Sequence, residues 1–181
     1  VYKRQKEVPA VVFNAVDEEV FQPRSIAPSR PAINLIVHGT LAYRHGLDLL
    51  LSAMPNILAK VPEAKLRIYG SGETVPDLRL QIEDLGIEDS VFLSGRYHPL
   101  EDMAKFVSEA DIGIIPYRQT VSTQYMLPTK LLEYLSVGLA VVTSETKPIK
   151  SLFRHELQIW ESEDPSELAE LVVQQIQNPI F

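Results

Sequence analysis

Short apolar runs alternate along this chain with segments of helical periodicity, and this alternation constrains the fold more than any other feature. The runs are rich in Val and Ile, have the length of strands, and most are apolar at successive positions. Continuous apolar strands are typical of a parallel sheet that helices cover on both faces. We predict strands in residues 11–13, 33–37, 66–69, 91–93, 112–115, 140–142 and, more weakly patterned, 157–160.

Helical patterns fill the intervals between these runs. Leucines and other apolar residues at three- and four-residue spacing predict a helix over residues 47–58, which Pro55 is expected to kink or split. Further helices are predicted over residues 77–85, 100–107, 128–135 and 165–177. Strand–helix repetition of this kind predicts a doubly wound, Rossmann-like parallel sheet in a three-layer α/β/α domain.

Prolines at positions 9, 23, 28 and 31 separate the first part of the chain from the rest. We therefore predict that residues 1–30 form a linker that contains the first strand, and that residues 31–181 form one domain. A chain of 181 residues with 45% hydrophobic content is suited to a single core. Its start at Val1 suggests a piece of a longer protein.

Composition excludes several classes of protein. The net charge of −7 argues against binding to nucleic acid through bulk electrostatics. The chain has no cysteine, which excludes disulfides and thiolate metal sites. The four histidines lack metal-ligand spacing, so no metal site is predicted. No apolar run approaches the ~18 residues that a spanning helix needs, and no secretory signal is visible, so a cytoplasmic location is expected.

Glycines and basic residues follow the predicted strands. In open parallel sheets, ligands bind beyond the carboxyl ends of the strands, where glycine permits close approach and helix N-termini offer free N–H donors. Lys130, Arg44 and also Arg118 are candidates to supply positive charge in an otherwise acidic chain. This arrangement predicts a site for a large phosphorylated ligand.

Several of these residues also have a purely structural explanation. Gly70-Ser71-Gly72 lacks the third glycine of a dinucleotide fingerprint, because Val75 stands there, which argues against a nicotinamide site. His38 is expected to be a buried or hydrogen-bonded histidine at a strand end. Arg96 is explained equally well as a solvated side chain. Glu133, on an otherwise apolar helix face, needs polar partners or the rim of a cleft, so we predict that it contacts the ligand.

Six short motifs, in order and at natural spacing, resemble the C-terminal domain of the group 1 family of GT-B glycosyltransferases, which are mostly retaining enzymes. The most specific is residues 128–135 with Gly138 and residues 141–142, which resembles the family's "P-x-K-x-x-E-Y…G-x-P-V-V" block. The others are residues 13–17 with Phe21 and Pro23, residues 39–46 with 49–53, residues 65–72, residues 91–96, and residues 110–113 with Pro116.

The resemblance implies a donor site for a nucleotide diphosphate sugar, with no separate cofactor. In it, Glu133 would hold the ribose hydroxyls, and Lys130 with the amides at the start of its helix would lie near the diphosphate or sugar. Arg44 and His45 would lie near the phosphate, and residues 95–97 would flank the base. The implied donor-binding residues are Gly39, Thr40, Arg44, His45, Gly70, Gly72, Gly95, Arg96, Tyr97, Thr129, Lys130, Leu131, Leu132 and Glu133.

The same resemblance implies that an N-terminal domain of the parent protein holds the acceptor. The chain is therefore expected to bind donor weakly and not to turn over alone, and any membrane association would reside in the other domain. The catalytic residues stay unassigned, and uridine and guanosine donors both fit.

Two departures from the family pattern keep alternatives open. Tyr125 occupies the position of a first glutamate that contacts the sugar in many members. Thr40 and His45 fall where the family has paired phosphate-binding basic residues, with Arg44 only adjacent. A non-catalytic GT-B-like domain that serves as a scaffold or interaction module is therefore one alternative, and an epimerase that acts on nucleotide sugars is another.

Overall fold

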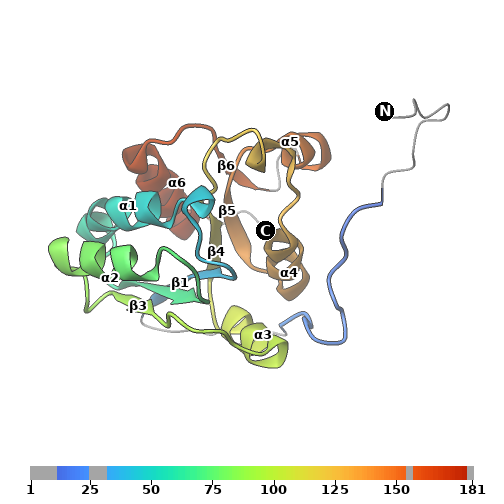
Figure 1. The fold of residues 1–181 in the computed structure, drawn as a ribbon, viewed down its shortest axis with the longest axis horizontal. Helices are drawn as coiled ribbons and strands as arrows, with labels where there is room; N and C mark the ends of the chain where they lie inside the picture. Colours follow the sequence, from blue (N-terminus) through green and yellow to red (C-terminus); the bar gives the residue numbers. More distant parts are fainter. Residues whose placement is uncertain (1–11, 25–31, 154–156, 179–181) are drawn as a thin grey trace.

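A computed structural model describes residues 12–24, 32–153 and 157–178 and shows a six-stranded, wholly parallel sheet (Figure 1). The strand order is β3-β2-β1-β4-β5-β6. The central strands are buried along most of their length because helices cover both faces. The strands are β1 (Ile33–His38), β2 (Ala64–Tyr69), β3 (Val91–Leu93), β4 (Ile112–Ile115), β5 (Ala140–Ser144) and β6 (Gln158–Trp160).

Helices form the two outer layers. The helices α1 (Leu47–Lys60), α2 (Val75–Asp84) and α6 (Pro165–Gln177) pack on one face, where their apolar side chains meet those of β1, β2 and β5. The helices α3 (Leu100–Ser108), α4 (Thr129–Val137) and α5 (Lys147–Leu152) pack on the other. Two 3-10 turns, η1 (Tyr43–His45) and η2 (Thr123–Tyr125), lie in loops. The predicted three-layer architecture is thus confirmed.

Six of the seven predicted strands and all five predicted helices are present. The exception is residues 11–13: residues 12 and 13 are irregular and exposed, and Val11 lies outside the described residues. Within the predicted linker, Phe21 is buried in the core beside α4, and its carbonyl accepts a hydrogen bond from Ser136 (2.7 Å). The division of the chain at residue 30 remains a prediction, because residues 1–11 and 25–31 are not described.

Two local features differ from the expectations. The helix α1 runs through Pro55 as one continuous element, so of the expected kink or split the split does not occur. The short helix α5 was not predicted. Thr146 caps it by accepting a hydrogen bond from the amide of Ile149 (3.3 Å), and Pro148 lies in its first turn.

In the described part of the chain, no helix combines the length and the apolar character needed to cross a bilayer.

Candidate functional site

The direction of the strand order changes between β1 and β4. The chain moves from β1 outward to β3 on one side, and from β4 outward to β6 on the other. Such a switch point leaves a crevice beyond the carboxyl ends of the two central strands. His38 ends β1 at this edge and residues 39–40 follow it, residues 116–118 follow β4, and α4 begins beside them.

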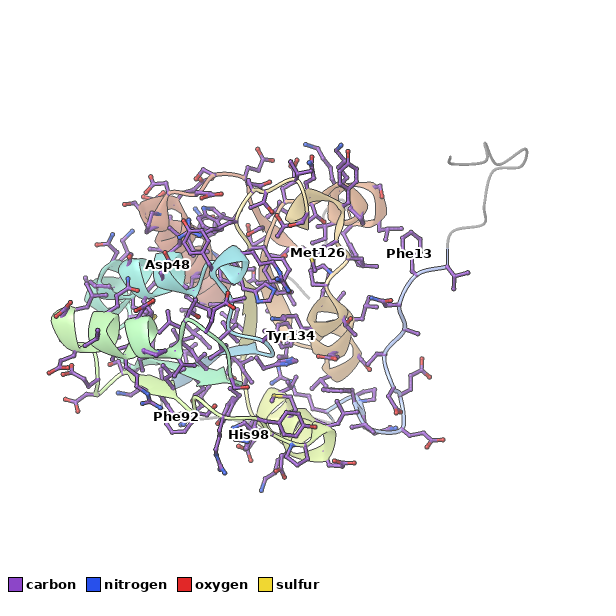
Figure 2. All side chains as sticks on the ribbon, in the orientation of Figure 1. Phe13, Asp48, Phe92, His98, Met126 and Tyr134 are labelled. Carbon is purple, nitrogen blue, oxygen red and sulfur yellow. The ribbon has the colours of Figure 1, made fainter. Side chains whose placement is uncertain are left out.

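The position of α4 depends on Tyr134. Its ring is fully buried, lies at the centre of the molecule in Figure 2, and its hydroxyl donates to the carbonyl of Ile36 in β1 (3.4 Å). Gly113 in β4 makes room for this ring, because a Cβ there would overlap it. The helix is thereby fixed across β1 and β4. Its first two turns bring Lys130 and Glu133 to the end of β1.

Lys130 is a buried cation at this edge. Its Nζ lies 5.4 Å from the centre of the Tyr117 ring, and a Cβ added to Gly39 would come within 3.4 Å of it. Burial lowers the pKa of Lys130 to about 8, against the opposing charge of Glu133. No side chain of the described residues caps the N-terminus of α4. A buried ammonium thus lies beside the free amides of a helix start, which is a combination suited to an anion.

Glu133 pairs with His38 at the end of β1. The Glu133 Oε2 lies 3.0 Å from the His38 Nε2, and the two side chains are 13% and 8% exposed. The pair is not aligned for a hydrogen bond, and neither atom has another hydrogen-bond partner within the described chain. Burial lowers the pKa of His38, outweighing the effect of Glu133, so its imidazole is neutral at pH 7.

His45 does not supply positive charge at neutral pH. Its Nδ1 lies 2.6 Å from the carbonyl oxygen of Thr40, which only accepts, so the proton resides on Nδ1. The ring stacks on Tyr117 with centroids 4.7 Å apart. Burial, together with the charge of Lys130, lowers the pKa of His45 to about 4. Positive charge at this edge therefore comes from Lys130 and from the exposed Arg44.

The glycines after β1 and β2 have different surroundings. A Cβ at Gly70 would overlap the carbonyl of Gly39, and a Cβ at Gly72 would overlap that of Leu41. These two glycines are thus explained by close contact between the two loops. At Gly39, by contrast, a Cβ would meet no backbone carbonyl of the described residues and would point toward the ammonium of Lys130.

A cavity of about 200 Å³ adjoins these loops, lined by Gly39, Thr40, Gly70, Ser71, Tyr97, His98 and Met103. The family resemblance implied that residues 95–97 flank the base; of these, Tyr97 lines the cavity, and His98 beside it was not predicted. This side chain is buried edge-on to the stacked rings of Tyr69 and Phe106, beside the start of α3 (Figure 2). Its Nε2 has no hydrogen-bond partner in the part of the chain that the structure describes. The sequence signal that could have identified His98 is its position directly after the Gly95-Arg96-Tyr97 turn.

The remaining predicted residues divide between exposed and buried positions. Tyr97, Arg96 and Thr129 are exposed, and Leu132 is half-buried. The Leu131 side chain is buried in the core, and its backbone amide donates to the carbonyl of Pro128 (3.0 Å). Gly95 (φ +65°) lies against Arg79, whose Nη2 would come within 2.7 Å of an added Cβ. A larger hollow of about 410 Å³ lies at the amino ends of β1, β2 and β3, away from this site.

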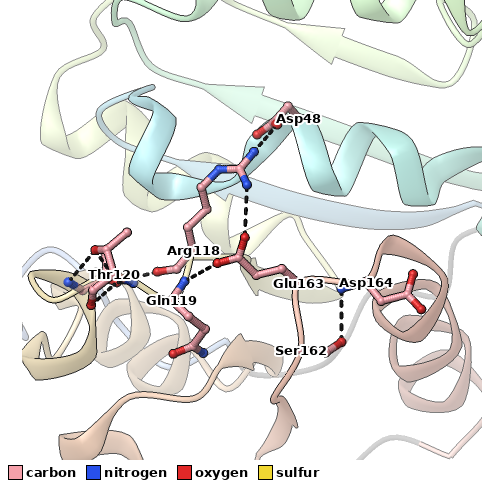
Figure 3. Close-up of polar contacts among 8 residues, drawn as sticks. Asp48, Arg118, Gln119, Thr120, Ser162, Glu163 and Asp164 are labelled. Carbon is pink, nitrogen blue, oxygen red and sulfur yellow. Dashed lines mark hydrogen bonds and ion pairs between the residues drawn. The ribbon is translucent and has the colours of Figure 1, made fainter.

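Arg118 does not face the ligand site, contrary to expectation. Its guanidinium pairs with Asp48 of α1 and with Glu163 (3.2 Å; Figure 3). It also lies over the ring of Tyr43, 4.1 Å from the ring centre. Two carboxylates thus hold this cation between α1 and the loop before α6. Over residues 12–24, 32–153 and 157–178, no cluster of three or more His, Asp or Glu side chains is placed to hold a metal ion.

Replacing Arg118 with methionine should lower the unfolding free energy by about 1–2 kcal/mol, because both ion pairs involve carboxylates that are partly exposed and screened. Nucleotide affinity should stay within about twofold of the wild-type value, a difference of under 1 kcal/mol. The reason is that Asp48 and Glu163 hold the Arg118 guanidinium away from the candidate site. Urea unfolding and nucleotide titration of the same sample measure the two quantities. A loss of affinity at unchanged stability would contradict the structural role.

Sequence comparisons relate this chain to known proteins. A sequence model described as Glycosyl transferases group 1 matches residues 32–178. The chain is 25% identical over 167 residues to a phosphatidylinositol N-acetylglucosaminyltransferase component from Arabidopsis thaliana, covering 91% of this chain and 36% of that protein. It is 34% identical over 94 residues to the amylovoran biosynthesis glycosyltransferase AmsK of Erwinia amylovora, covering 51% and 23%. The chain thus spans about a third or less of these relatives.

Solved structures show the same fold. The C-terminal domain of the group 1 glycosyl transferase LpcC from Francisella tularensis superposes with a TM-score of 0.74 at 16% identity, covering 91% of this chain and 89% of that one. HepE from Anabaena, in complex with UDP and glucose, gives a TM-score of 0.76 at 18% identity, covering 93% and 47%. The six-stranded sheet with its two helical layers is therefore the Rossmann-like half of a GT-B fold.

Proposed function

This chain belongs to the group 1 glycosyltransferase family, and we propose that it is the half of such an enzyme that binds a nucleotide diphosphate sugar. The observation that carries the proposal is the buried ammonium of Lys130 beside Gly39 and the uncapped start of α4. The sugar would pass to an acceptor held by an N-terminal domain of the parent protein, with retention of configuration as the family resemblance implies.

The chemistry of glycosyl transfer fits these groups. As the bond from the sugar to the diphosphate breaks, negative charge grows on the departing phosphate. Preorganised donors that face this charge stabilise the transition state more than the ground state. The Lys130 ammonium and the first amides of α4 supply such donors without a metal. The Glu133 carboxylate supplies acceptors for the two adjacent hydroxyls of a ribose.

The cavity beside Tyr97 and His98 would take the base. HepE was solved with UDP and glucose, which supports a uridine donor. The residues of this chain are equally compatible with guanosine. The base is therefore left to the experiment.

Titration of the chain with UDP, GDP, ADP and their sugar nucleotides tests the proposal. One nucleotide should bind saturably. The Glu133→Gln variant should lower its affinity about 10- to 100-fold, because hydrogen bonds to a charged group are lost. Glu63→Gln, an exposed charge in a surface turn, is the matched control and should have no effect.

One observation favours the scaffold alternative. His45 is neutral at pH 7, and Thr40 carries no charge, so two positions of the family's basic pair provide no cation. If a folded sample binds no nucleotide, and the parent protein binds none either, the donor-site proposal is wrong. The fold would then serve protein–protein contact.

A further inference from the structure

Two buried polar atoms face each other between β1 and α4. The His38 Nε2 and the Glu133 Oε2 lie 3.0 Å apart, and no other group of the described chain hydrogen-bonds to either. Buried polar atoms in native proteins are nearly always paired, so each exception requires an explanation. Here both atoms lie at the crevice edge, next to the Lys130 ammonium.

The surroundings of His38 define its protonation. The groups that act on it come from α4: Lys130 and Glu133 through their charges, and Tyr134 through a ring contact at 5.2 Å. Tyr69 lies opposite it in register on β2. Burial keeps the imidazole neutral, since it lowers the pKa of His38. A neutral ring this close to a carboxylate is attractive only if Nε2 carries the proton, because two lone pairs would repel.

We propose that His38 is a positioning residue for Glu133: its Nε2–H holds one carboxylate oxygen so that the other accepts hydrogen bonds from the two ribose hydroxyls. The inference rests on the donor-site function proposed above. A neutral donor fixes the carboxylate without cancelling its charge, which a lysine or arginine in its place would do. The two atoms already lie within hydrogen-bond distance, at 3.0 Å, and hydrogen bonds at functional sites often become well aligned only in the ligand complex.

The test is a set of titrations with UDP and GDP and with their 2′,3′-dideoxy counterparts. His38→Leu should lower affinity for the ribonucleotide about tenfold, the effect of losing one good hydrogen bond, and leave dideoxynucleotide affinity unchanged. His38→Gln, which keeps a side-chain N–H donor, should restore most of the loss. In a Glu133→Gln background, His38→Leu should have no further effect, because the carboxylate to be positioned is gone.

Thermal unfolding of each variant separates folding from binding. If His38→Leu weakens ribo- and dideoxynucleotides equally, or if its effect adds to that of Glu133→Gln, His38 has only a packing role and the inference is wrong. If the wild-type chain binds nucleotides without distinguishing the dideoxy forms, the inference fails while the nucleotide-binding function stands. Absence of binding to every nucleotide, by the folded chain and by the parent protein, overturns both.

Discussion

Replacing Lys130 with methionine should lower the affinity for the nucleoside diphosphate by about 10- to 100-fold, because charge-assisted hydrogen bonds to the diphosphate are lost. Methionine matches the apolar stem of lysine and relieves the burial of the charge, so the fold should remain at least as stable. Isothermal titration calorimetry measures the loss. Lys60→Met, an exposed change at the end of α1, is the matched control and should leave the affinity unchanged.

The same residue predicts a pH dependence. The free protein loses the Lys130 proton as pH rises through about 8, since burial lowers this pKa from 10.5. An anionic ligand binds the charged form, so the affinity for a sugar nucleotide should fall between pH 8 and 10. The Lys130→Met variant should lack this fall. Equal wild-type affinity at pH 7 and pH 9.5 would contradict a role for the ammonium.

The stability of the free protein should change in the opposite direction over this range. The folded-state pKa of Lys130 is about 8 and the ordinary value is 10.5. Between these values the unfolded chain binds more protons than the folded chain, so this residue makes stability rise with pH.

Replacing Gly46 with alanine should destabilise the fold by about 2–5 kcal/mol. The left-handed backbone at this position (φ +62°) accounts for about 1–2 kcal/mol with any L side chain. A Cβ would also overlap the backbone carbonyl of Pro116, and such overpacking costs about 1–3 kcal/mol. Because this glycine joins η1 to α1 beside β4, the damage would extend to the loop that carries Arg44 and His45.

Gly86 offers a control with the same backbone strain. Its φ is +63°, and among the described residues no heavy atom lies within 4 Å of an added Cβ. Gly86→Ala should therefore cost only the backbone contribution, about 1–2 kcal/mol. Urea unfolding of both variants, with unchanged m-values, measures the difference. Equal losses at the two positions would show that the Pro116 carbonyl moves aside.

The sequence predicted those elements whose local pattern and tertiary environment agree. The strand β4 is buried along its length and carries no polar side chain, and β5 is buried too and is apolar over its first three residues. The helix α6 begins as predicted, where Asp164 caps the helix and Pro165 opens it. The six-residue α5 is too short to show a periodic pattern, and the irregular residues 12–13 show that a short apolar run alone does not make a strand.

Pro55 shows packing overriding local preference. A proline inside a helix removes a backbone hydrogen bond and costs about 3 kcal/mol. Leu50, Leu51, Met54 and Ile57 around it are all fully buried in the sheet-facing core of α1. Most helical stability in proteins comes from such packing. The stabilisation from burying this face therefore exceeds the cost of the proline. The local sequence does not show how these two contributions compare.

The location of the candidate site followed from the glycines and basic residues after each strand, but its pairings did not. Glu133 meets His38, and Arg118 meets Asp48 and Glu163, through contacts between distant segments. The neutrality of His45 depends on burial that a sequence does not display. Which residues lie at the sheet edge could thus be predicted from the topology. Their protonation states and their interaction partners could be determined only from the folded structure.

The packing of α6 against α1 has a consequence for protein synthesis. Both helices belong to the same core: Leu50 and Met54 of α1 share it with Leu168 and Val172 of α6, and Figure 1 shows the two helices side by side. The ribosome makes α1 long before α6. During that interval the nascent chain presents an incompletely covered apolar helix face, the kind of surface that aggregates or binds chaperones. Only when residues up to Gln177 have emerged can the domain close this face.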